Sequence, residues 1–385
     1  MTTVLLTALE ASGDILGAEL MAALRRRLGP DVRFIGVGGP AMAAAGLVSA
    51  FDIAELSVVG LIEGIFAYRR ADRRARQLTE LAAREKPDIA VLIDSWGFNY
   101  LLGRHLRGAL PGLPLVKYVA PQAWATRPGR TKALARIFDR LLSIIAFEVP
   151  LFEAAGIRTT FVGHPALAEN VPVGDRARLR SRIAAAEADP VLLILPGSRA
   201  SEVRRLMPPF ESAVALLKQD RPDLHVVVAP APTVAAKVTA RVAGWPFRAH
   251  LIDDPEGRQD AMAGADVALA CSGTVTTELA VAGCPMIVAY RLGGLGYQVA
   301  KRIVRTRFIT LINIAADAAI APEMIQDDCT GPKLALELAK RLDDPELRAA
   351  QAKAQVQALE KLGGRGPPPS ERAADAILEL LSLRS

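Results

Sequence analysis

Ile89-Ala90-Val91-Leu92-Ile93 is an uninterrupted apolar run that ends at a carboxylate, Asp94. Such runs are typical of parallel strands covered by helices on both faces, because neither face of the strand meets water. Similar short runs alternate with helical patterns along the first half of the chain, and the strands predicted there are residues 3–7, 33–37, 89–93, 115–119, 141–145 and 160–162. This alternation of strand and helix predicts a doubly wound α/β domain.

The same pattern starts again after a polar, charged stretch around residues 168–190. Further strands are predicted at residues 191–195, 225–229, 267–271 and 286–290. Two Rossmann-like domains follow, facing a cleft, since open α/β sheets bind ligands at the carboxyl ends of their strands. We expect domains at residues 1–170 and 171–362, then a Gly/Pro hinge and a final helix at residues 363–385. The apolar stripe of that helix must pack back onto its own chain or onto a partner.

Composition excludes several classes of protein. With 51% hydrophobic and 23% charged residues, the chain of 385 residues is globular rather than disordered, and its three scattered cysteines exclude a disulfide scaffold. The net charge of +6 suggests anionic partners, but no nucleic-acid module is recognisable. Neither a D-x-D triplet nor a Cys/His pair at metal-ligand spacing occurs, so no metal or other cofactor is expected. The N-terminus lacks signal-peptide features and no apolar run could span a bilayer, so we expect a cytoplasmic location.

Polar residues of the first domain cluster where its predicted strands end. Glu10-Ala11-Ser12-Gly13-Asp14 opens the first helix, and Gly38 lies in a glycine-rich turn after the second strand. Because helix N-termini bind anions or hydroxyl-bearing ligands, Glu10, Ser12, Gly38 and Asn99 are candidate ligand-binding residues. An ordinary capped turn and a glycine-rich turn without a ligand remain open as alternatives.

Three residues of the first domain are candidates for a general base. Asp94 is the first of them, because it ends a strongly apolar strand, where its carboxylate is expected to point into the cleft. His164 follows the last strand, beside the linker, and Asp14 lies at the start of the first helix. The alternatives are a helix cap for Asp94 and a hydrogen-bonded structural role for His164.

The second domain carries two segments that could hold phosphate, each between a strand and a helix. Gly197, Ser198 and Arg199 combine backbone N–H groups, a hydroxyl and a guanidinium, and residues 272–278 supply small hydroxyl residues and an acid. Glu278, one turn into its helix, is placed to accept hydrogen bonds from ribose hydroxyls. The pair predicts a nucleoside diphosphate site formed by Gly197, Ser198, Arg199, Ser272, Gly273, Thr274, Thr276, Thr277 and Glu278.

Residues 56–76 have the pattern of a membrane-surface segment. An apolar stretch from Leu56 to Tyr68, too short to span a bilayer, runs directly into clustered arginines. The residues expected to contact an anionic membrane are Val58, Leu61, Ile65, Phe66, Arg69, Arg70 and Arg73. A core helix followed by a solvated basic helix is the alternative.

Taken together, these motifs resemble one family, lipid-A-disaccharide synthase, a glycosyltransferase of the GT-B architecture. The motifs that match are residues 10–14, 36–40, 56–63, 93–94, 98–99, 124, 161–165, 195–199, 202, 272–278, 285–291, 313, 322–323 and 326, in the family's order. The resemblance adds Asn313, Glu323 and Gln326 to the expected nucleotide site. It also makes the sugar acceptor the expected ligand of the acceptor-binding residues Glu10, Ser12, Gly38 and Asn99. The chain departs from the family's pattern at Trp96-Gly97, where a Pro-Asp pair is usual.

The resemblance implies an inverting transfer from UDP-2,3-diacylglucosamine to 2,3-diacylglucosamine 1-phosphate, which yields lipid A disaccharide 1-phosphate and UDP. It also implies a peripheral enzyme on the inner face of the inner membrane. Family members include homodimers that exchange C-terminal segments, and the hinge before Ser370 is compatible with such an exchange. Another GT-B enzyme, with a different lipid acceptor or with UDP-sugar 2-epimerase activity, and a non-catalytic two-lobed binding protein are the alternatives.

Overall fold

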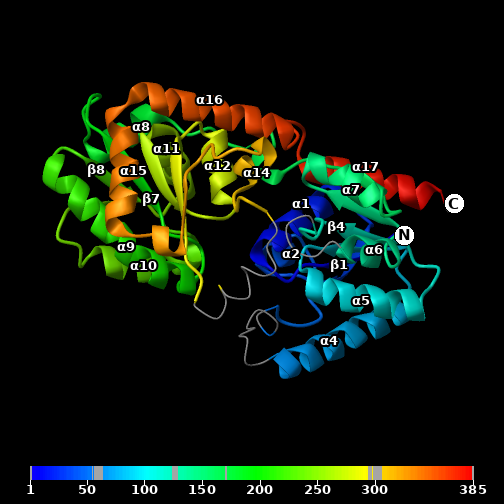
Figure 1. Ribbon diagram of the computed structural model, residues 1–385. Coiled ribbons are helices and arrows are strands. Elements are labelled where there is room, and N and C mark those ends of the chain that lie inside the picture. The colour runs from blue at the N-terminus through cyan, green and yellow to red at the C-terminus, as the bar shows by residue number, and fades with distance from the viewer. Residues whose placement is uncertain are drawn as a thin grey trace. The chain divides into compact units, whose positions relative to one another are not determined.

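The computed structural model describes residues 2–53, 55, 64–123, 129–169, 171–293, 297 and 306–383, without the side chains of residues 64–67. The chain forms two compact units (Figure 1). The first unit combines Met1–Glu169 with Gly366–Ser385, and the second unit is Asn170–Arg365. The chain therefore leaves the first unit and returns to it near its end.

The first unit is built on a six-stranded parallel sheet in the order β2-β1-β3-β4-β5-β6. Its strands are β1 (Thr3–Thr7), β2 (Arg33–Val37), β3 (Ile89–Ile93), β4 (Leu115–Tyr118), β5 (Arg140–Ser143) and β6 (Arg158–Phe161). Its helices are α1 (Ala11–Leu28), α2 (Pro40–Ala44), α4 (Gly64–Glu85), α5 (Trp96–Ala109), α6 (Gly129–Ala135), α7 (Val149–Glu153) and α17 (Pro369–Ser382). The short 3-10 turns η2 (Ala146–Glu148) and η3 (Pro165–Leu167) complete it.

Successive side chains of a strand point to opposite faces of the sheet, so they pack in two different hydrophobic cores. Leu5, Ala90 and Leu92 pack with α4 and α5 on one face, whereas Val4 and Val91 pack with α1 and α17 on the other. Both faces of β1 and β3 are thus buried, which explains their uninterrupted apolar sequence.

The second unit repeats this plan with the strand order β12-β11-β10-β7-β8-β9, again all parallel. Its strands are β7 (Val191–Leu195), β8 (His225–Val228), β9 (His250–Leu251), β10 (Val267–Cys271), β11 (Met286–Tyr290) and β12 (Glu323–Ile325). Its helices are α8 (Arg176–Ile183), α9 (Ala200–Asp220), α10 (Ala235–Val242), α11 (Pro255–Gly264), α12 (Val275–Val281), α14 (Leu311–Ala316), α15 (Gly331–Asp343) and α16 (Pro345–Lys361). The 3-10 turns η4 (Pro232–Val234) and η5 (Gln326–Asp328) lie between them.

A hydrophobic core of this unit joins the sheet to α9, α10 and α15. Phe210 of α9, Val238 of α10 and Leu338 of α15 pack there with strand residues such as Leu192 and Leu269. Two parallel sheets with flanking helices confirm the predicted doubly wound α/β class. The prediction missed β9 and β12, which at two and three residues are too short to give an apolar run.

The final helix, α17, packs on the first unit beside α1 (Figure 1). Ala373, Ala374 and Ile377 are buried in the core that α1 also lines. Ion pairs also hold the helix, including Arg27 with Asp375 at 2.6 Å and buried Arg140 of β5 with Glu379 at 2.7 Å. In the described parts of the chain, helices of the length and apolarity needed to cross a bilayer are absent.

Candidate active site

Asp94 follows β3 at the carboxyl edge of the first sheet, in an unusual backbone conformation. Its φ is 48° and that of Ser95 is 37°, so two consecutive non-glycine residues lie in the left-handed region. Such a conformation costs about 1–3 kcal/mol per residue and persists only where its surroundings enforce it. Strained backbone of this kind clusters at functional sites, and the Asp94 side chain is only partly buried.

Asn99 holds this turn instead of facing a ligand. It is fully buried, and its amide nitrogen donates to the main-chain carbonyls of Ile93 at 2.8 Å and Asp94 at 2.9 Å. Its amide oxygen accepts a hydrogen bond from the Thr7 hydroxyl at 2.9 Å. Since both ends of the amide are satisfied within the fold, the geometry favours a supporting role for Asn99 over direct acceptor binding.

Glu10 and Ser12 are exposed at the start of α1, near the same sheet edge. The Ser95 hydroxyl lies 3.4 Å from a Glu10 carboxylate oxygen, which places Glu10 next to the Asp94 turn. These two side chains are available to a ligand, as an acceptor-binding role requires.

Asp14 is 3% exposed, and its carboxylate caps the N-terminus of α2. It accepts the main-chain N–H groups of Gly39 at 2.8 Å, Ala41 at 2.8 Å and Met42 at 3.0 Å. Three charge-assisted bonds to a helix N-terminus leave little capacity for proton transfer, so the geometry favours a structural role.

Gly38 is buried below the same turn. A Cβ atom at this position would lie 2.6 Å from the Met42 sulfur, so a larger residue would displace α2. Close packing therefore accounts for this glycine, independently of a ligand.

His164 is 5% exposed and caps η3, with Nδ1 accepting the Ala166 N–H at 3.2 Å. Burial lowers the pKa of His164 to about 4. The imidazole is therefore neutral near pH 7 and a weak proton acceptor. Asp94 is the base candidate that is partly exposed and whose carboxylate is not committed to capping a helix.

In the second unit, the turn between β7 and α9 is occupied by its own glutamate. One carboxylate oxygen of Glu202 accepts the N–H groups of Ser198 at 3.0 Å and Arg199 at 3.2 Å, and the other accepts the Arg199 guanidinium at 3.0 Å. Gly197 has a φ of 104°, and a Cβ there would lie 2.6 Å from this carboxylate. The turn thus already binds an anion, and a diphosphate bound here would compete with Glu202 for the same donors.

The turn between β10 and α12 has exposed positions at Gly273 and Thr274, with Ser272 half-buried. Thr276 is internal, because its hydroxyl donates to the Gly273 carbonyl at 2.8 Å. The hydroxyl of Thr277 is buried without a hydrogen-bond partner in the described structure. Glu278 is partly exposed and forms an ion pair with Arg258 of α11 at 3.5 Å. Arg258 is not among the site residues predicted from the sequence.

Asn313, Glu323 and Gln326 bind the chain itself. The Glu323 carboxylate accepts the N–H groups of Ile309 and Thr310, the Thr310 hydroxyl at 2.6 Å and the Asn313 amide at 2.9 Å. The Gln326 amide oxygen accepts the Leu292 N–H at 2.6 Å. These residues fix the loops that follow β11, and a role in nucleotide binding stays a prediction.

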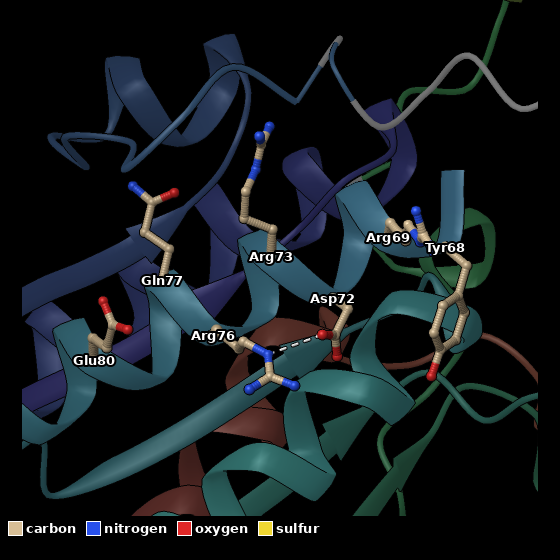
Figure 2. Close-up of a pocket in the computed structure, with 7 residues that line it drawn as sticks. All are labelled: Tyr68, Arg69, Asp72, Arg73, Arg76, Gln77 and Glu80. Carbon is tan, nitrogen blue, oxygen red and sulfur yellow. Dashed lines mark hydrogen bonds and ion pairs between the residues drawn. The ribbon is translucent and has the colours of Figure 1, made fainter. Parts of the chain in front are cut away.

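The basic segment lies on α4, where residues between Tyr68 and Glu80 line a hollow of about 360 Å³. Figure 2 shows their side chains on successive turns of this helix. Arg69 and Arg73 line the hollow, and no described residue forms an ion pair with either of them. Arg70 is exposed and donates to the Glu55 carbonyl at 3.2 Å. Val58 and Leu61 lie outside the described residues, as do the side chains of Ile65 and Phe66.

Lys117 is the residue of the first unit that sequence reasoning missed. It is 1% exposed, lies in β4 and donates to the carbonyl of Asp94 at 2.5 Å. The signal was a single cation inside an otherwise apolar predicted strand, residues 115–119. As for metals, the described side chains of His, Cys, Asp and Glu include no group of three placed to bind one.

Solved structures share this fold at low sequence identity. The chain matches an S. aureus MnaA–UDP structure with a TM-score of 0.65 and 14% identity, covering 100% of this chain and 98% of that chain. It matches MurG of Acinetobacter baumannii with a TM-score of 0.60 and 18% identity, covering 98% and 100%. At these identities the likeness concerns the fold, two Rossmann-like domains as in GT-B glycosyltransferases.

Sequence relatives are much closer. A lipid-A-disaccharide synthase of Paramagnetospirillum magneticum is 43% identical over 97% of this chain and 96% of its own length. The lipid-A-disaccharide synthase of Rhodospirillum centenum is 41% identical over 99% and 95%. The family model described as lipid-A-disaccharide synthetase matches residues 4–376. Because both relatives and family model extend over almost the whole sequence, the chain belongs to the lipid-A-disaccharide synthase family.

Proposed function

We propose that this chain is an inverting, UDP-sugar-dependent hexosyltransferase of lipid A biosynthesis. It would join UDP-2,3-diacylglucosamine to 2,3-diacylglucosamine 1-phosphate and release UDP and the β-1,6-linked disaccharide 1-phosphate. Family membership over residues 4–376 supports this activity. The UDP-sugar 2-epimerase alternative is not favoured, since a Neisseria meningitidis UDP-GlcNAc 2-epimerase matches with 12% identity and thus in fold alone.

In the proposed mechanism Asp94 is the general base. Its carboxylate takes the proton of the acceptor 6-hydroxyl while that oxygen bonds to the anomeric carbon, and the bond from this carbon to the UDP oxygen breaks. The observation that carries this assignment is the left-handed turn at Asp94 and Ser95, held by Asn99 at the carboxyl end of β3. Exposed Glu10 and Ser12 would position the acceptor.

The second unit would bind the nucleotide. Arg199 and the N-terminal turn of α9 would stabilise the charge on departing UDP, as preorganised donors do. The segment from Ser272 to Thr277 would supply a second phosphate contact, and Glu278 would accept hydrogen bonds from the ribose. This arrangement assigns charge stabilisation to protein groups and requires no metal.

Further proposals concern location and assembly. We place the enzyme on the cytoplasmic face of the inner membrane, with the exposed Arg69 and Arg73 facing anionic lipid. A homodimer that exchanges its C-terminal segments would form the α17 contacts between two copies instead of within one.

The base assignment is tested with Asp94→Asn, which keeps the shape of the side chain but removes its basicity. We expect acceptor-dependent UDP release to fall by about 10²–10⁴-fold, with UDP affinity unchanged. Asp14→Asn serves as the matched control, because Asp14 caps α2 and should leave kcat within a few-fold. Turnover by Asp94→Asn close to that of the unchanged enzyme would refute Asp94 as the base.

A further inference from the structure

Lys117 is a fully buried cation at the centre of the first sheet. It lies in β4, where it pairs with Leu92 of β3 and Leu141 of β5, and its side chain is 1% exposed. A buried ammonium is unfavourable unless hydrogen bonds replace the water it has lost. The ammonium of Lys117 must therefore be hydrogen-bonded to specific acceptors, and the identity of these acceptors indicates the role of the residue.

All three protons of the ammonium are used by main-chain carbonyls. Nζ donates to Leu92 O at 3.2 Å, to Tyr118 O at 3.1 Å and to Asp94 O at 2.5 Å. No described carboxylate forms an ion pair with it. The Asp94 carbonyl is thus fixed from two directions, since it also accepts the Asn99 amide at 2.9 Å.

The backbone that Lys117 holds is the strained part of the site. Asp94 and Ser95 have positive φ angles, and so does Val119, a β-branched residue at 69° that follows β4. Left-handed residues of this kind persist only when neighbouring groups compensate their strain. Lys117 joins both strained turns, because its carbonyl partners include Asp94 after β3 and Tyr118 before Val119.

We propose that Lys117 is a positioning residue for glycosyl transfer, whose ammonium fixes the Asp94 main chain and so sets the location of the reacting carboxylate. This inference rests on the proposed role of Asp94 as the base. Burial lowers the pKa of Lys117, and the nearby carboxylates of Asp94 and Glu10 partly oppose this effect. The resulting pKa is about 7. In its charged form the ammonium donates three charge-assisted hydrogen bonds to these carbonyls.

A double-mutant cycle with Lys117→Met and Asp94→Asn tests the proposal. Methionine keeps the length of the side chain but donates no hydrogen bond. We expect Lys117→Met to lower kcat by roughly 10²-fold, the effect of a misplaced catalytic group, with the KM for UDP-sugar within about two-fold. Because Lys117 acts through Asp94, the double variant should be as slow as Asp94→Asn alone.

Two neighbouring substitutions serve as controls for damage to the sheet. Arg140→Met removes a buried cation from the adjacent strand, and Tyr118→Phe removes a buried hydroxyl that has no partner in the described structure. Both should keep kcat within about three-fold, as no described hydrogen bond or ion pair joins either side chain to the Asp94 turn. Assays are run at a temperature where circular dichroism shows every variant folded. If Lys117→Met does not fold, Lys117→Leu, which likewise donates no hydrogen bond, takes its place in the cycle.

The outcomes separate the two proposals. If Asp94→Asn has a reduced kcat while Lys117→Met has the kcat of the unchanged enzyme, only the positioning role is overturned. Independent, multiplicative losses in the double variant would also overturn it, because Lys117 would then act without Asp94. A fully active Asp94→Asn would overturn the proposed base itself. A reduced kcat in Lys117→Met with no further loss in the double variant supports both.

Discussion

Acid should destabilise the first unit through His164, and the size of the effect follows from its burial. Burial lowers the pKa of His164 from 6.5 to about 4 in the folded chain. The unfolded chain therefore takes up a proton first as the pH falls. His164 contributes its full stability above pH of about 6.5, and this contribution is lost as the pH falls towards 4. A difference of about 2.5 pKa units corresponds to about 3 kcal/mol in the free energy of unfolding.

The matched variant is His164→Asn. Asparagine can still accept the Ala166 N–H that caps η3, but it does not titrate. Urea unfolding of both proteins at pH 7.5, 6, 5 and about 4 gives the comparison. Tryptophan fluorescence is followed in a Trp245→Phe background, because Trp245 is buried in the second unit.

We expect the unchanged chain to lose about 3 kcal/mol more than His164→Asn over this range. The pKa of His250, also lowered by burial, affects both proteins equally and cancels in the difference. Equal losses in the two proteins would refute the reasoning. The same variant tests His164 as a base, since a folded His164→Asn enzyme with a loss in kcat above 10²-fold would restore it as a candidate.

Three further predictions concern α17, the nucleotide and the membrane. Ile377→Ala removes a fully buried side chain between α17 and α1, and should lower the free energy of unfolding by about 2–5 kcal/mol in urea titrations. Arg199→Met should weaken UDP binding by about 10- to 100-fold in calorimetry, through loss of a charge-assisted contact, whereas an unchanged Kd would remove Arg199 from the site. Arg69→Gln/Arg73→Gln should weaken binding to vesicles containing phosphatidylglycerol by ~30-fold, at about 1 kcal/mol per arginine. The charge-matched double variant Arg33→Gln/Arg84→Gln should bind these vesicles as tightly as the unchanged chain. An equal loss of vesicle binding in the two double variants would show a general charge effect instead.

The central strands were predictable because their physical cause is local. Residues 89–93, 191–195 and 267–271 are apolar throughout since helices cover both faces of each sheet, and the structure places β3, β7 and β10 at these bounds. The edge strands β9 and β12 have no such requirement and left no pattern.

The site was less predictable, because its hydrogen bonds join residues that are far apart in sequence. From the sequence, Asp14 is a candidate general base, but in the structure the main-chain N–H groups of Gly39 and Met42 donate to its carboxylate. Asn99 likewise depends on Thr7, 92 positions away. Lys117 is different, since a lysine inside an apolar strand is visible in the sequence and needed only a partner to explain it.

The return of the chain to the first unit has a consequence for synthesis on the ribosome. Residues 170–365 contain every strand and helix of the second unit, so that unit can fold once they have emerged. The first unit, although made earlier, lacks Ala373, Ala374 and Ile377 until α17 is translated. Its sheet face beside α1 stays open during that interval, so the half of the enzyme made first is the half completed last.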